Sequence, residues 1–74
     1  MIQKVIGQRI KELRTNASIT QEELAYRAGL DRTYINSVEN GRRNLSIVNV
    51  EKIAGAFGFS VKDFFDSDKF GTKA

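Results

Sequence analysis

Apolar residues recur every three or four positions along most of this 74-residue chain, and this spacing is typical of one buried face of an α-helix. The first such run consists of Ile2, Ile6, Ile10, Leu13 and Ala17. It predicts a helix over residues 3–15 whose apolar face lies inward. Gly7 falls within this run and is expected to cost the helix only a little stability.

Two shorter helical patterns meet at Gly29. Their apolar positions are Leu24, Ala25, Ala28, Leu30, Ile35 and Val38. Thr20 and Glu23 form a capping-box pattern, in which the hydroxyl accepts from the Glu23 amide and the carboxylate reaches back. Asp31 is the expected N-cap of the next helix, which runs to residue 39 or 40 before Gly41. Because glycine suits the left-handed conformation of a sharp turn, the arrangement predicts a helix-turn-helix.

The second half of the chain predicts two more helices after a loop over residues 41–45. Ser46 is the expected cap of the fourth helix, and Gly58 ends it. Its inward stripe consists of Ile47, Val50, Ile53, Ala54 and Phe57. Ser60 and Asp63 repeat the capping-box pattern and open a short fifth helix. We therefore expect an all-α domain over residues 1–66 with one shared core, followed by a flexible tail over residues 67–74.

Composition narrows the possible functions. The chain has no cysteine and no histidine, so disulfides, the usual zinc sites and the common catalytic constellations are not expected, and no cofactor is implied. One small domain leaves no room for a separate domain that senses a small-molecule effector. No apolar run is long enough to span a membrane, and the N-terminus does not resemble a signal peptide. The expectation is a cytoplasmic protein that is not an enzyme.

The positive charge is concentrated in the first half of the chain. The formal net charge is +3, and residues 1–45 hold eight Lys or Arg against five Asp or Glu, whereas residues 46–74 hold four of each. Every arginine lies in the first half. Arginine is the better partner for phosphate and guanine, so this distribution favours a nucleic-acid face. The alternative is an ordinary solvated surface.

The combination of IGQRIKELR, TQEELAYRAGLDRTYINSVENG and VEKIAGAFGFSVKDFF resembles the small Xre/Cro-type repressor family. The resemblance implies a compact five-helix, lambda-repressor-like domain whose second and third helices form the helix-turn-helix. Within that family, LDRTYI followed by GRRNLSIVNVEKIA looks like the controller proteins of restriction–modification systems. Those proteins are homodimers that regulate their own operon and the nuclease gene. Ser18, where the family often has glycine, and Leu45, where many members have proline, depart from the common pattern.

A helix-turn-helix inserts the start of its second helix into the major groove, where base edges are accessible and distinct. Arg32 is the residue expected to read guanine. The alternative role for its side chain is a contact with a phosphate. Thr33 offers a methyl group to thymine and a hydroxyl to a base or phosphate. Tyr34 is expected against the DNA backbone or a base step, unless it packs in the core. Asn36 and Ser37 lie one turn further on and either reach further bases or face solvent.

Phosphate contacts must hold the reading helix in register. At the start of the second helix, Gln21 and the free backbone amides are expected to clamp one phosphate, as the resemblance also implies. A second group is expected at the entrance to the fourth helix, and its members are Arg42, Arg43, Asn44 and Ser46. The resemblance further implies that Arg14 and Glu39 form a buried ion pair between the first and third helices.

A single reading helix covers too few base pairs to select an operator, so we expect a homodimer on a palindromic duplex DNA site. The expected interface residues are Ile47, Val48, Phe59, Val61, Phe64 and Phe65. For any one phenylalanine, the alternative is the monomer core. RNA polymerase is a further candidate partner of such a regulator. The competing hypothesis is an antitoxin or bridging protein whose main role is to bind another protein.

Overall fold

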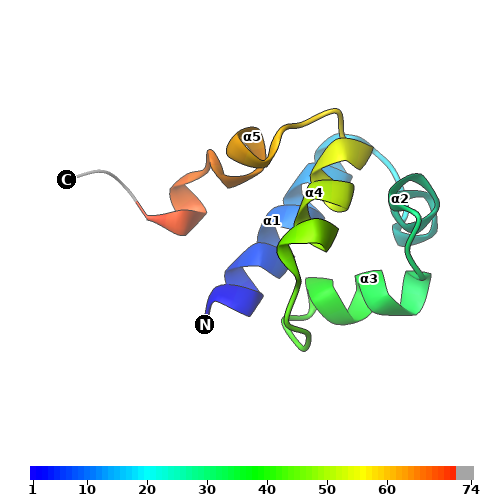
Figure 1. Cartoon of the computed structure of the whole chain (residues 1–74), viewed down its shortest axis with the longest axis horizontal. Helices are drawn as coiled ribbons and strands as arrows, with labels where there is room; N and C mark the ends of the chain where they lie inside the picture. The colour runs from blue at the N-terminus through cyan, green and yellow to red at the C-terminus, as the bar shows by residue number, and fades with distance from the viewer. Residues whose placement is uncertain (72–74) are drawn as a thin grey trace.

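Five α-helices follow one another in the order that the hydrophobic pattern predicts, in a computed structural model that describes residues 1–71. They are α1 (Ile2–Asn16), α2 (Gln21–Ala28), α3 (Arg32–Glu39), α4 (Ile47–Ala56) and α5 (Val61–Phe65), followed by a short 3-10 helix, η1 (Asp68–Phe70) (Figure 1). The all-α prediction is confirmed, since residues 1–71 form no strand. No helix in this range is both long enough and apolar enough to cross a membrane.

All five α-helices contribute to one buried cluster. α1 packs against α3, and α4 packs against both α2 and α5. The buried apolar residues are Ile10, Leu13, Leu24, Ala25, Ala28, Ile35, Val38, Val50, Ile53, Ala54 and Phe64. Three residues predicted to face inward are instead exposed: Ile2, Ala17 and Ile47. All three stand at the ends of their helices, where the neighbouring helices no longer cover them.

Side-chain caps fix several helix starts. The Ser60 hydroxyl accepts from the Asp63 amide at 3.0 Å while the Asp63 carboxylate accepts from the Ser60 amide at 3.2 Å, so the predicted capping box is confirmed. Thr20 accepts from the Glu23 amide at 3.0 Å, but the Glu23 carboxylate pairs with Arg27 at 2.8 Å instead of reaching back. Helix α2 therefore has half of its predicted box, because Arg27 one turn later offers the carboxylate a charged partner.

Two tight turns place α3. Gly29 has a φ of 69° and ends α2 in the left-handed conformation, as predicted. Asp31 occupies the N-cap position of α3, although its carboxylate makes no capping bond to the described residues. The turn between α1 and α2 contains Ser18 with a φ of 58°, which a serine adopts less easily than glycine. The serine at this family glycine position therefore keeps the glycine conformation.

Gly7 sets the distance between α1 and α3. A Cβ atom at position 7 would lie 2.6 Å from the Glu39 carbonyl oxygen and closer still to that of Val38. Both atoms belong to the backbone at the end of α3, so they cannot move aside as a flexible side chain could. The sequence pattern indicated only a small cost of this glycine within a helix. In the structure it is what allows α1 to approach the reading helix.

Replacing Gly7 by alanine should destabilise the protein by about 1–3 kcal/mol, because α1 and α3 must separate to admit the methyl group. The matched control is Gly55→Ala in α4, where an added Cβ would meet no atom of residues 1–71 within 4 Å. That change should be neutral or stabilising by up to about 1 kcal/mol, the helix propensity difference. Urea unfolding of both variants provides the comparison. If Gly7→Ala were as stable as Gly55→Ala, the close approach of the two helices would be incorrect.

Arg9 is buried, and it ties α1 to the end of α5. Its Nε donates to the Phe64 carbonyl oxygen at 2.8 Å, and one Nη donates to that of Asp63 at 3.0 Å. The other Nη pairs with Glu12 at 2.9 Å. The guanidinium thus satisfies carbonyl groups left free at a helix C-terminus. Arg9 therefore does not belong to the nucleic-acid face that the distribution of arginines predicted.

The segment that follows α5 is more ordered than the sequence predicts. Residues 68–70 form η1, and the Phe70 ring packs against the rings of Phe64 and Phe65 with centroids 6.3 and 4.9 Å apart. The predicted flexible tail is therefore wrong for these residues, because Phe70 anchors them to the core. Ser67 and Gly71 of the predicted tail cap the two ends of η1, and residues 72–74 lie outside the described residues.

Candidate nucleic-acid interface

The first turn of α3 projects outward from the domain. Ile35 and Val38 point into the core, and the opposite face presents Arg32 and Thr33 to solvent. Asn36, one turn after Arg32, is also exposed, whereas Ser37 is half-buried. Of the side chains predicted to read bases, Arg32, Thr33 and Asn36 are therefore accessible, as the helix-turn-helix geometry requires.

Tyr34 joins α3 to the start of α4. Its ring is half-buried, its hydroxyl accepts a hydrogen bond from the Asn49 carboxamide at 3.0 Å, and the Arg43 guanidinium carbon lies 5.2 Å from the ring centroid. Tyr34 therefore packs partly against the core, which was the alternative to a DNA contact. A cation over an aromatic face is attracted to it. Tyr34 therefore holds the predicted phosphate ligand Arg43 beside α3.

Open depressions lie on both sides of the projecting turn. One is lined by residues of the α2–α3 turn and of the α4 entrance, namely Gly29, Leu30, Asp31, Thr33, Tyr34, Arg43 and Asn49. The other brings the start of α2 next to α3 and is lined by Arg14, Thr20, Gln21, Glu22 and Arg32. The two predicted phosphate sites therefore flank the predicted reading side chains. Rows of phosphates likewise flank the major groove on both sides.

The predicted phosphate ligands differ in how free they are. Arg42 and Arg43 are exposed in the loop before α4. The Asn44 carboxamide oxygen accepts from the Gln3 side chain at 2.6 Å, and the Ser46 hydroxyl accepts from the Asn49 amide at 3.1 Å as the cap of α4. Ser46 and Asn44 are thus engaged in shaping the loop. The oxygen atoms of both side chains therefore already have partners within the protein.

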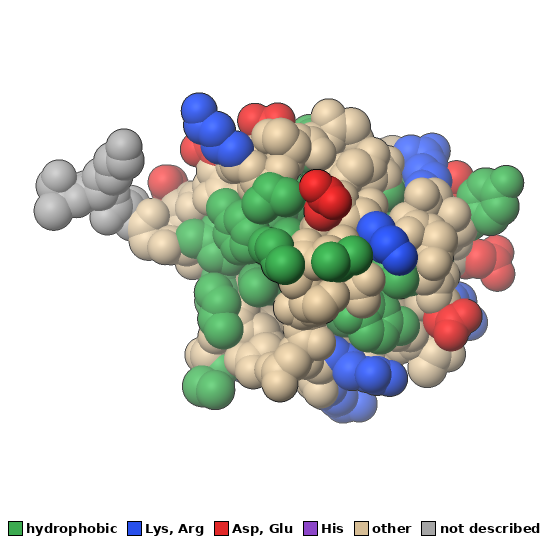
Figure 2. Space-filling model, viewed as in Figure 1, with side chains coloured by type: hydrophobic (Ala, Val, Ile, Leu, Met, Phe, Trp, Pro, Cys, Tyr) green, Lys and Arg blue, Asp and Glu red, His purple; other side chains and the backbone are tan. Residues whose placement is uncertain are grey.

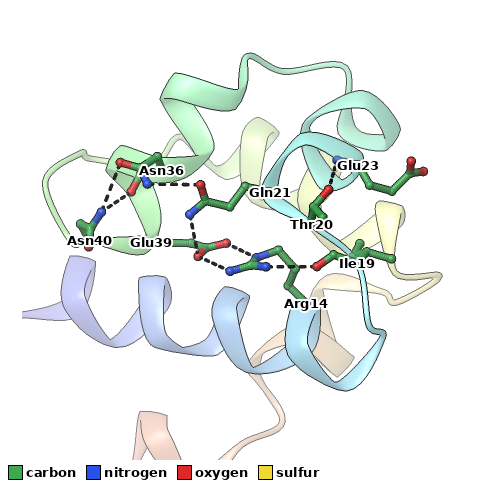
Figure 3. A network of polar contacts seen from close by, with 8 residues as sticks. All are labelled: Arg14, Ile19, Thr20, Gln21, Glu23, Asn36, Glu39 and Asn40. Atoms are coloured by element: carbon green, nitrogen blue, oxygen red, sulfur yellow. Dashed lines mark hydrogen bonds and ion pairs between the residues drawn. The ribbon is translucent and has the colours of Figure 1, made fainter.

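Arg14 and Glu39 form the ion pair that the family resemblance implies (Figure 3). Arg14 Nε and one Nη donate to the two Glu39 oxygens at 2.8 and 3.1 Å, and the other Nη donates to the Ile19 carbonyl oxygen at 3.0 Å. The Glu39 side chain is only 4% exposed. Its hydrogen bond to Arg14 raises the pKa of the guanidinium, outweighing the burial that lowers it. The pair joins α1 to α3.

The face formed by α4, α5 and the N-terminus gathers hydrophobic side chains (Figure 2). Ile47 and Val48 are 65% and 57% exposed, and Phe59, Val61 and Phe65 are half-buried. Phe64 is completely buried, so its assignment to a dimer surface is wrong. Its ring lies in the monomer core, which is the alternative that the sequence left open.

Asn49 and Arg9 are the structurally important residues that the sequence pattern did not identify. Asn49 lies in the first turn of α4, and its side chain donates to the Tyr34 hydroxyl 15 residues earlier in the chain. Arg9 binds backbone carbonyl groups more than 50 residues away along the chain. A carbonyl partner leaves no trace in the sequence, because every residue has one.

Comparisons with known proteins agree with this geometry. A sequence model described as "Helix-turn-helix" matches residues 10–64. Control protein C.BamHI of Bacillus amyloliquefaciens is 41% identical over 71 residues, which cover 95% of this chain and 88% of that protein. The restriction–modification controller protein C.AhdI from Aeromonas hydrophila has a solved structure with a TM-score of 0.81 and 44% identity, covering 85% of this chain and 96% of that one.

A third similar structure contains DNA. It is the restriction–modification controller protein C.Esp1396I, solved as a tetramer in complex with its natural 35 base-pair operator, with a TM-score of 0.84 and 38% identity. The match covers 89% of this chain and 87% of that one. With the exposed reading turn, the flanking depressions and the matched residues taken together, this chain belongs to the helix-turn-helix family of DNA-binding transcription regulators.

Proposed function

We propose that this protein is a sequence-specific regulator of transcription that binds a palindromic duplex DNA operator as a homodimer and controls restriction–modification genes. The observation that carries the proposal is the accessible turn that bears Arg32 and Thr33, with a depression on each side. The relatives named as control proteins, one of them solved on its operator, supply the biological class. They give no support to the antitoxin alternative.

The proposed division of roles follows exposure. Arg32 and Thr33 read base edges, with Asn36 and Ser37 further along the groove. On one side, the α2 amides contact the phosphate together with the second N–H of the half-buried Gln21 carboxamide, whose first N–H donates to Glu39. On the other side, Arg42 and Arg43 contact phosphates. No catalytic role and no small-molecule effector belong to this proposal. RNA polymerase is the partner through which a bound regulator would act on a promoter.

Selection of duplexes from a random DNA pool tests the proposal directly. Regulators of this kind discriminate a specific site from other DNA by a factor of about 10³ or more. We expect the selected duplexes to share two inverted half-sites whose centres lie about one helical turn apart. Recovery of unrelated sequences, all bound with the same affinity, would reject a sequence-specific regulator.

The homodimer is proposed to form through the exposed part of α4. Replacing Val48 by aspartate removes one buried valine from each copy, worth about 1.5 kcal/mol each, so the dimer dissociation constant should rise about 100-fold. Tyr26→Asp is the matched control, because Tyr26 is 82% exposed on α2, away from this face. Sedimentation at several concentrations measures both. A wild-type protein that is monomeric on DNA would contradict the homodimer.

A further inference from the structure

A chain of hydrogen bonds runs from the buried ion pair to the surface of the reading helix (Figure 3). Glu39 Oε1 accepts from the Gln21 carboxamide nitrogen at 3.1 Å as well as from Arg14. The Gln21 carboxamide oxygen accepts from Asn36 Nδ2 at 3.2 Å, and Asn36 Oδ1 accepts from Asn40 Nδ2 at 3.3 Å. Three helices therefore share one continuous polar network.

The direction of every bond in this network follows from Glu39. A carboxylate can only accept hydrogen bonds, so Gln21 must turn its NH₂ group toward it. Rotating the Gln21 carboxamide by half a turn would place its oxygen against a buried negative charge. The Gln21 oxygen consequently faces α3, and Asn36 must donate to it. The buried charge thus determines which way round an exposed carboxamide is held.

On the basis of the proposed function, we infer that Glu39 is a positioning residue for DNA reading, because it sets the orientation of Asn36 through Gln21. Asn36 uses one N–H on Gln21 and one lone pair on Asn40, and it keeps a second of each for a ligand. A neighbouring donor and acceptor on one carboxamide match the major-groove edge of adenine. A carboxamide held in one orientation presents its donor and acceptor in a fixed order, so it distinguishes an A·T pair from a T·A pair.

A purely structural role for the ion pair would make a different prediction. It would anchor α1 to α3, and its loss would weaken folding and all DNA binding equally. Orientation through Gln21 instead predicts that positions 36 and 39 are coupled mainly through Gln21. It also predicts that losing Glu39 lowers the base preference at only one base pair of each half-site.

The first experiment uses the protein alone. Asn36→Asp places an acceptor against the Gln21 oxygen, so it should destabilise the wild-type protein. In the Glu39→Gln background Gln21 can reverse and donate, so the same change should cost less. We expect a coupling of about fivefold in the unfolding equilibrium constant, the size of one hydrogen bond. In the presence of Gln21→Ala this coupling should fall to about twofold, the direct repulsion between two carboxylates three residues apart on α3. A coupling that stays fivefold would overturn the inference.

The second experiment measures base preference by fluorescence anisotropy. The probes are the duplex selected by the wild-type protein and the set of duplexes that differ from it by one base pair. Glu39→Gln should lower the preference about fivefold at a single position of each half-site and leave the other positions unchanged. Glu23→Gln is the matched control, because Glu23 is an exposed glutamate with a similar arginine partner. It should change no position.

The outcomes separate the two proposals. A uniform loss across all duplexes, or no loss, with an intact wild-type preference would overturn this inference alone. A wild-type protein with no preference in the selection experiment would overturn the proposed function. The unfolding experiment needs no DNA, so it still reports whether Glu39 orients Gln21 and Asn36.

Discussion

Replacing Arg32 by alanine should lower the affinity for the selected duplex by about 1–3 kcal/mol in each half-site, which is about 2–6 kcal/mol for a homodimer. Arg32 is exposed on the first turn of α3, where its guanidinium can donate two hydrogen bonds to the O6 and N7 atoms of guanine. The variant should therefore also accept other bases at that position. Fluorescence anisotropy with the selected duplex and its single-base variants measures both effects.

Arg43→Ala is the control that distinguishes a loss of base recognition from a loss of electrostatic attraction to phosphates. It removes the same charge, but Arg43 lies over Tyr34 beside the turn and is not on α3 itself. We expect it to weaken selected and scrambled duplexes alike and to reduce the slope of log K against log salt by about 0.9 for each phosphate that is no longer neutralised. Both substitutions are on the surface, so stability should change by less than about 0.5 kcal/mol for Arg32→Ala and by at most about 1 kcal/mol for Arg43→Ala, which also loses the contact with the Tyr34 ring. Identical behaviour of the two variants would refute the assignment of Arg32 as a reader.

The second large effect is expected for Glu39→Ala, which should destabilise the fold by about 3 kcal/mol, the lower end of the range for breaking a buried pair. Among the described residues, the substitution leaves the Arg14 guanidinium with only the Ile19 carbonyl oxygen, and it removes the partner that orients Gln21. The lower end applies because the Arg14 side chain is 17% exposed and can regain some water. Urea unfolding measures the loss.

The matched control for that loss is Glu23→Ala. Its pair with Arg27 has the same 2.8 Å separation, but both side chains are nearly half exposed. Exposed pairs of this kind contribute about 0–1 kcal/mol. If the two alanine variants lost the same stability, burial would not determine the strength of the Arg14–Glu39 pair. The double substitution of Arg14 and Glu39 by methionine should be close to neutral, because it leaves no unpaired charge.

Features that depend on neighbours along the chain could be predicted from the sequence. Ser60 caps α5 three residues before Asp63, and Gly29 ends α2 with a positive φ, because both depend on the conformation of a few consecutive residues. The outward position of Arg32 follows in the same way from the spacing of Ile35 and Val38. These predictions required only helical periodicity.

Features that depend on distant parts of the chain could not be predicted in this way. Nothing near Gly7 in the sequence indicates that the end of α3 touches it, and nothing near Arg9 indicates the carbonyl groups of α5. Periodicity also could not distinguish Phe64 from Phe65. The first is completely buried and the second is half-buried, although they are consecutive in one short helix.

Arg9 also affects which spacing between the two half-sites of an operator such a protein could bind. Its bonds to the end of α5 fix the proposed dimer face to α1, and α1 in turn lies against the reading helix. In a dimer of two such copies, the two reading helices would be held at a fixed separation and a fixed relative orientation. One extra base pair in the operator both lengthens it and turns one half-site by about a tenth of a revolution around the duplex axis. A rigid dimer would therefore bind operators with one half-site spacing and would not bind operators whose spacing is one base pair longer or shorter.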